Sequence, residues 1–209
     1  MTLLKQGTGS ALTGMVGPIV IAEWKGKTYM RSAPKRKVKN SWSPEQLAHR
    51  KRFKMVIAFC TQFKELLIPQ IWNDATDRMS GFALFLKTNM PAFAADGILI
   101  DPNLIRLSTG KLPMVEELKA ERSAPGSNTI TVSWSKSIVW GGIRSKDELM
   151  VVSAGGGKYS EITGTGIIRY ALNGSFELPL DPPSATYIYL FFGSKDRRDY
   201  SESVCFALD

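Results

Sequence analysis

The sequence predicts an α+β protein built in three parts. Residues 1–40 are expected to be an extended glycine-rich arm with a β-hairpin and a basic tract, and residues 41–97 a hairpin of two helices. Residues 98–209 are expected to form an antiparallel β-sandwich of fibronectin or immunoglobulin type. Three observations support this division: frequent glycines at the start, an apolar period of about 3.6 residues in the middle, and apolar alternation towards the end.

The arm is expected to hold one hairpin. Glycines interrupt the first 17 residues so often that neither helix nor strand can run far there, because each glycine raises the entropic cost of order. Residues 18–24 are rich in β-branched side chains, and residues 28–31 follow after a short connection that contains Gly26. A hairpin alone is marginally stable in water, so it needs a surface to lie on, from its own chain or from a neighbour.

The first helix has a defined start. Ser43 is a good N-cap, Pro44 suits the first helical position and Gln46 follows three residues after the cap. The apolar period then continues towards Pro69, which is expected to end or kink the helix. A second helix is predicted over residues 75–89, with Asn73 or Asp74 as its cap.

The last part alternates in apolar character between turn residues, as expected for a sandwich. Trp134 lies where a core tryptophan is expected, and the lack of a cysteine pair around it favours the fibronectin type. Residues 110–128 are expected to be a loop or a short helical turn. The predicted strands are residues 104–107, 129–134, 148–152, 166–170, 175–178, 186–192 and 203–207.

Positive charge is concentrated in residues 25–54. This segment holds eleven Lys and Arg against one acid, Glu45, a balance of +10, and the remaining 16 basic and 18 acidic residues leave −2. So confined a charge indicates a polyanion or an acidic protein surface as partner. The side chains expected to contact it are Trp24, Tyr29, Arg31, Lys35, Arg36, Lys37, Lys39, Trp42, Arg50, Lys51 and Arg52.

The sequence argues against an enzyme, and no catalytic, metal-binding or cofactor-binding residue is predicted. The only histidine is His49, and neither a second histidine nor clustered cysteines complete a zinc site. The run Gly155-Gly156-Gly157-Lys158-Tyr159 departs from a phosphate-binding loop and is predicted to be a hairpin loop. Cys60 and Cys205 are expected to be buried free thiols.

No apolar run approaches the roughly 18 residues of a membrane span, and the first ten residues do not form a secretory signal. We expect synthesis in the cytoplasm, with incorporation into a virion or a larger assembly left open.

Two segments stand out as motifs: Trp24-Lys25-Gly26-x-x-Tyr29-x-Arg31-Ser32-x-Pro34 in the arm, and Ser43-Pro44-Glu45-Gln46-Leu47-Ala48-x-Arg50 at the helix start. Together they resemble a bacterial and phage-associated family with no assigned activity. Ser43 stands where the family usually has threonine, and either residue can cap the helix. The resemblance implies a sandwich-like C-terminal half and no established catalytic site.

Two classes of function are therefore expected. In the first, the protein is a non-enzymatic building block whose arm and hairpin dock on another copy, giving a filament, ring or virion-type particle. In the second, the tract over residues 25–54 binds nucleic acid through its cations and aromatic rings. A third interpretation has the basic segment lying on the protein's own acidic sandwich.

Overall fold

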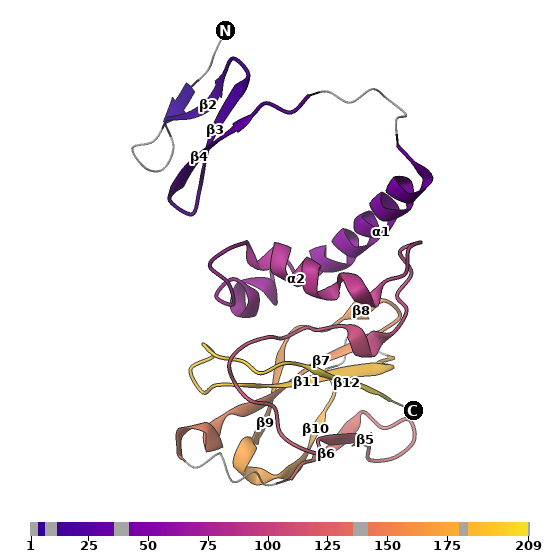
Figure 1. The fold of residues 1–209 in the computed structure, drawn as a ribbon. Helices are drawn as coiled ribbons and strands as arrows, with labels where there is room; N and C mark the ends of the chain where they lie inside the picture. Colours follow the sequence, from indigo (N-terminus) through magenta and orange to yellow (C-terminus); the bar gives the residue numbers. More distant parts are fainter. Residues whose placement is uncertain (1–3, 7–11, 36–41, 136–141, 180–183, 209) are drawn as a thin grey trace. The chain divides into compact units, whose positions relative to one another are not determined.

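The computed structural model describes residues 4–6, 12–35, 42–135, 142–179 and 184–208. The chain divides into two compact units, Met1–Ser43 and Pro44–Asp209. The predicted helical segment and the predicted sandwich lie together in the second unit. The elements confirm an α+β protein with antiparallel sheets (Figure 1).

The first unit is a four-stranded antiparallel sheet in the order β1 (Leu4–Gln6), β2 (Leu12–Val16), β3 (Ile19–Trp24) and β4 (Lys27–Ser32). The predicted hairpin is confirmed as β3 and β4. Its turn consists of Lys25 and Gly26, with φ angles of 47° and 73°, the left-handed pair that a two-residue hairpin turn requires. The glycines keep β1 and β2 short without abolishing them, so the sheet is two strands wider than predicted.

In the second unit, α1 (Pro44–Thr61) begins at the predicted residue but ends before Pro69. The chain continues through turns into a π-helix, η1 (Ile68–Trp72), which has Pro69 in its first turn. The prediction for the second helix is wrong at its start and right at its end, since α2 spans Gly81–Asn89. Its cap is Ser80, whose hydroxyl oxygen accepts a hydrogen bond of 3.2 Å from the Ala83 amide. Two 3-10 turns follow, η2 (Met90–Ala92) and η3 (Pro102–Leu104).

The sandwich consists of two antiparallel sheets. One has the order β10-β6-β5 and the other β12-β11-β7, with β8 and β9 both paired to β7. The bounds are β5 (Lys119–Arg122), β6 (Thr129–Ser133), β7 (Glu148–Gly155), β8 (Lys158–Tyr159), β9 (Thr163–Ile168), β10 (Asn173–Glu177), β11 (Tyr187–Gly193) and β12 (Val204–Ala207), with 3-10 turns η4 (Gly142–Lys146) and η5 (Arg169–Ala171).

Three details differ from the predicted strands. Residues 104–107 form the end of η3 and irregular chain instead of a strand. The predicted strand over residues 166–170 gives way to η5 after Ile168. Within the predicted loop 110–128, residues Lys119–Arg122 form strand β5. The antiparallel sandwich is confirmed, and its fibronectin or immunoglobulin type stays a prediction.

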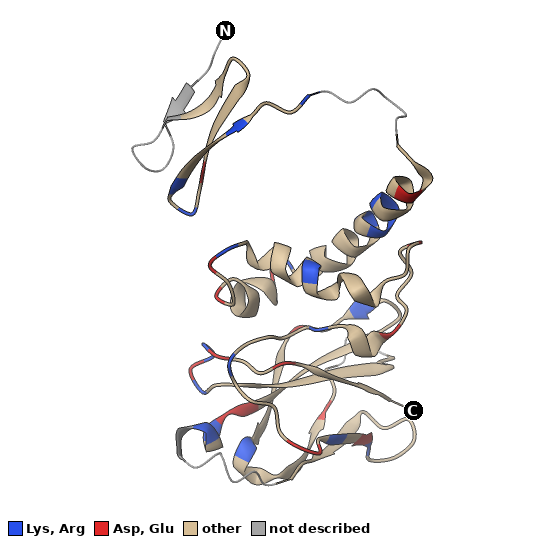
Figure 2. Cartoon of the chain, in the orientation of Figure 1, with Lys and Arg blue, Asp and Glu red and all other residues tan. Residues whose placement is uncertain are grey.

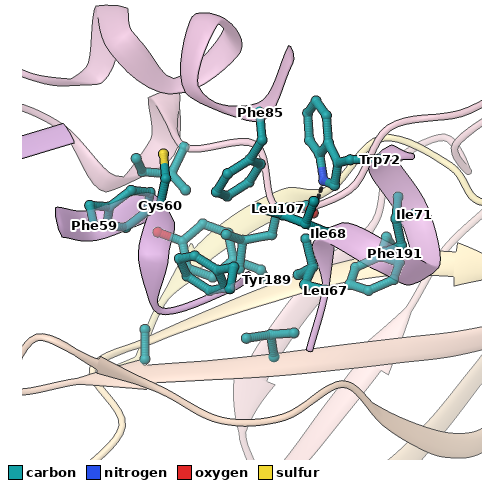
Figure 3. Packing of buried hydrophobic residues seen from close by; sticks show 14 of the residues in the cluster. Phe59, Cys60, Leu67, Ile68, Ile71, Trp72, Phe85, Leu107, Tyr189 and Phe191 are labelled. Carbon is teal, nitrogen blue, oxygen red and sulfur yellow. Dashed lines mark hydrogen bonds between the residues drawn. The ribbon is translucent and has the colours of Figure 1, made fainter. Parts of the chain in front are cut away.

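Strands β7 and β11 are buried on both faces. Leu149, Val151 and Leu190 face a core shared with Ile130 and Val132 of the smaller sheet. The alternate residues of the same two strands face the helices (Figure 3): Met150, Val152, Tyr189 and Phe191 pack in one cluster with Phe59, Phe63, Trp72 and Phe85. The second unit is therefore three layers deep, with helices on one face of the larger sheet and the smaller sheet on the other.

Candidate partner-binding surface

The register of β3 and β4 separates their side chains into two different faces. Trp24 pairs with Lys27, Ala22 with Tyr29 and Val20 with Arg31. Paired residues of antiparallel strands point to the same side, as do alternate residues of one strand. Trp24, Lys27, Tyr29 and Arg31 therefore share one face, which we call the cationic face.

The cationic face is open to solvent. Trp24 keeps 51% of its surface exposed and Tyr29 46%, and Lys27 and Arg31 are exposed as well. Figure 2 shows lysine and arginine in and beside this hairpin. Glu23, the one acid among residues 1–43, pairs with Thr28 and belongs to the opposite face. No acidic residue described in this sheet lies on the cationic face.

The opposite face, which carries Glu23, also holds a group of apolar side chains. Val16 pairs with Ile19, and Ile21 pairs with Met30, so these four side chains lie on one side of the sheet. Met30 is 71% exposed, and Val16 and Ile19 are also exposed. We call these four residues the apolar face.

The described residues of the first unit cover neither face. Every residue of segment 13–35 is exposed or half-buried. A sheet of this size normally gains its stability by burying one face, and the described residues of this sheet bury neither.

The other predicted contact residues belong to segments outside β3 and β4. Lys35 is exposed three residues after β4, and Trp42 is half-buried shortly before α1. The predicted residues Arg36, Lys37 and Lys39 lie outside the described residues.

On α1, Arg50 and Lys51 are exposed, and Figure 2 shows the positive charge of this half of the helix. Arg52 is half-buried, and its Nη2 donates a hydrogen bond of 2.7 Å to the carbonyl oxygen of Met90, the C-cap residue of α2. This bond satisfies a carbonyl at a helix C-terminus, where a cation is favourable. Arg52 thus has an internal structural contact that the sequence did not indicate.

The sequence predictions do not include the apolar face: Ile19 and Ile21 are expected in a strand without assignment to a face, and Val16 lies in the glycine-rich start. The signal that identifies it is the two-residue turn at Lys25 and Gly26, because this turn fixes which side chains pair across the hairpin. Alternation then assigns every residue of the hairpin to a face.

The remaining chemically active residues have ordinary structural surroundings. Burial raises the pKa of the Cys60 thiol to about 12 and that of Cys205 to about 11, which leaves little thiolate at neutral pH. Cys60 is buried as predicted, and Cys205 is half-buried. The predicted hairpin loop is confirmed, with Gly156 and Gly157 forming the turn between β7 and β8.

Among the described residues, no group of three or more His, Cys, Asp and Glu side chains could hold a metal ion. No helix within the described part of the chain has the length and apolar character needed to span a membrane.

The chain was compared with known proteins. No curated protein and no solved structure matches it. A family model described as a family of unknown function, DUF6266, matches residues 11–206, which include most of the N-terminal sheet, both helices and the sandwich. This confirms a family without assigned activity, whereas the bacterial or phage setting stays a prediction. The protein therefore belongs to DUF6266, a family of unknown function.

Proposed function

We propose that the protein is a structural building block that self-assembles through its N-terminal sheet. The observation that supports this proposal is the sheet β1–β4, which exposes an apolar face and a cationic face with neither covered inside its unit.

A second copy of the chain is the partner that best fits the apolar face. Sheets stack face to face at about 10 Å, and stacking two copies would cover the four apolar side chains on each. Fully burying one such side chain is worth about 1.5–3 kcal/mol. Because these residues start half-exposed, the gain for each is roughly half of that. The contact is isologous, because each of the two copies contributes the same apolar face to it.

Charge offers a second contact between copies. Residues 1–54 hold 12 basic and 2 acidic residues, a balance of +10, whereas residues 55–209 hold 15 basic and 17 acidic residues, a balance of −2. The basic tract of one copy is therefore complementary to the acidic remainder of the next. This contact is heterologous, and together with the isologous one it would extend an assembly beyond a dimer to a ring, a filament or a virion-type particle.

The mass of the protein in solution tests this proposal. Light scattering after size-exclusion chromatography is expected to give a mass that rises with concentration above the 23.1 kDa of one chain. The triple variant Ile19→Thr, Ile21→Thr, Met30→Thr keeps β-compatible residues but removes most of the apolar face, and should shift the mass towards the monomer.

The matched control is Ile98→Thr with Ile100→Thr, two exposed apolar residues of the second unit, which should associate like the wild type. A wild type that stays monomeric at every concentration would support the interpretation in which the arm lies on its own chain, and would refute self-assembly. So would a triple variant that associates as strongly as the wild type.

A further inference from the structure

We infer that the cationic face of the β3–β4 hairpin is a binding site for single-stranded nucleic acid. This goes beyond self-assembly through the apolar face, because the surface lies on the opposite side of the sheet.

The arrangement alternates rings and cations. Lys27, Tyr29 and Arg31 occupy every second position of β4, so they form one row, and Trp24 stands directly across from Lys27. Trp24 and Tyr29 are diagonal neighbours, a relation in which Cα atoms are about 7–8 Å apart. That spacing lets successive bases of an extended strand stack on the two rings while the neighbouring cations contact phosphates.

The charge of the unit favours a polyanion. Residues 1–43 hold eight Lys and Arg against Glu23 alone, a balance of +7, and Glu23 faces the other way. The sequence continues beyond β4 with Lys35, Arg36, Lys37 and Lys39. A backbone of phosphates approaching this face would meet no described acidic side chain on it.

The exposed rings favour single strands over other polyanions. Cations alone are sufficient to hold a duplex by its phosphates, and a duplex keeps the faces of its bases stacked inside. An acidic protein surface offers carboxylates but few flat rings to stack against. Single-stranded DNA or RNA presents both a charged backbone and a π-face at every base.

Fluorescence anisotropy of a labelled thymidine oligonucleotide or RNA of about 20 nucleotides measures this binding on the full chain. Trp24→Ala is expected to weaken it about 5- to 150-fold, the range found for loss of one stacked base. Trp24→Phe retains a ring and should restore most of the affinity. Tyr170→Ala, which removes an exposed ring from the second unit, should leave the affinity unchanged.

Salt dependence tests the phosphate contacts. The slope of log K against log salt is expected to become shallower by about 1.4 in the double variant Lys27→Gln, Arg31→Gln, since each phosphate contact with a single strand contributes about 0.7. Lys87→Gln with Lys111→Gln removes two exposed lysines of the second unit and should leave the slope unchanged.

The same titrations in the triple variant Ile19→Thr, Ile21→Thr, Met30→Thr distinguish this inference from self-assembly. The triple variant should still bind the oligonucleotide, even if it no longer associates. The inference is overturned if the wild type does not bind, or if Trp24→Ala binds as tightly as the wild type. It is also overturned if a duplex of the same sequence or poly-glutamate binds as tightly as the single strand, the latter indicating an acidic protein partner. Circular dichroism of each variant reports on whether the sheet is retained.

Discussion

Replacing Phe85 with alanine is expected to lower the free energy of unfolding of the Pro44–Asp209 unit by about 3–5 kcal/mol. The Phe85 side chain is fully buried. Its ring centroid lies 5.0 Å from that of Trp72, 5.4 Å from that of Phe63 and 6.2 Å from that of Phe59. Figure 3 shows Phe85 with Trp72 and Phe59. The substitution opens a cavity where α1, η1 and α2 meet, and densely packed aromatic neighbours cannot easily collapse into it.

Urea unfolding followed by circular dichroism and by tryptophan fluorescence measures this loss. The two signals should coincide for the second unit, because helices and sandwich share β7 and β11 as a common layer. Phe53→Ala is the matched control: it removes the same ring from an exposed position on α1 and should cost less than about 1 kcal/mol. Helices that melt well before the sandwich would contradict the three-layer unit, as would a cost below about 1 kcal/mol for Phe85→Ala.

The second large effect is expected at a buried ion pair. Arg169 Nε lies 3.4 Å from Asp147 Oδ2, both side chains are buried, and the Arg169 guanidinium lies 4.1 Å from the centre of the Phe192 ring. Burial raises the pKa of Asp147 and lowers the pKa of Arg169, and the opposite charge of the partner opposes both shifts. Asp147→Ala should cost about 3–5 kcal/mol, because it leaves the arginine charge buried without its carboxylate.

The double variant Asp147→Ala, Arg169→Met distinguishes the cost of a buried unbalanced charge from the cost of lost packing. It removes both charges and retains an apolar chain over Phe192, so its free energy of unfolding should recover much of the loss. The same urea titration checks both variants. If the single variant is as stable as the wild type, or the double variant is less stable than the single, the pair does not have this role.

Local sequence signals predict several elements correctly. Pro44 at the first helical position defines the start of α1, and the Lys25-Gly26 turn defines the β3–β4 hairpin. The start of α2 was misplaced because residues 73–80 contain several side chains able to cap a helix, and local chemistry does not rank Asn73 and Asp74 below Ser80.

The prediction of a strand over residues 104–107 is wrong because this segment is partly buried but does not pair with another strand. This segment alternates like a strand, but side chains replace the partner strand: the Arg106 amide donates to Asn89 Oδ1 at 2.7 Å, and the Leu107 amide donates to Ser203 Oγ at 2.9 Å. Apolar alternation indicates which side chains are buried. It does not indicate whether the backbone amides of the segment donate to the carbonyl oxygens of a neighbouring strand or to side-chain oxygens.

Charge clustering and aromatic content predict that the N-terminal segment contacts a partner, but they do not resolve its two faces. Trp24, Tyr29 and Arg31 are predicted contact residues because of their chemistry, whereas Ile19 and Ile21 are predicted only as residues of a strand. Whether a strand residue is core depends on what covers the sheet, and this is not encoded in the strand itself.

The account depends on another molecule covering the N-terminal sheet. Hydrogen exchange of the β3 and β4 amides, followed by mass spectrometry over a range of protein concentrations, tests this most directly. Association stabilises only the covered state of the sheet. We therefore expect the protection of the β3 and β4 amides from exchange to increase with protein concentration, and the protection of the β11 amides to stay constant. Strong protection of β3 and β4 that does not change from dilute to concentrated protein would contradict the account, because the sheet would then be stabilised within a single chain.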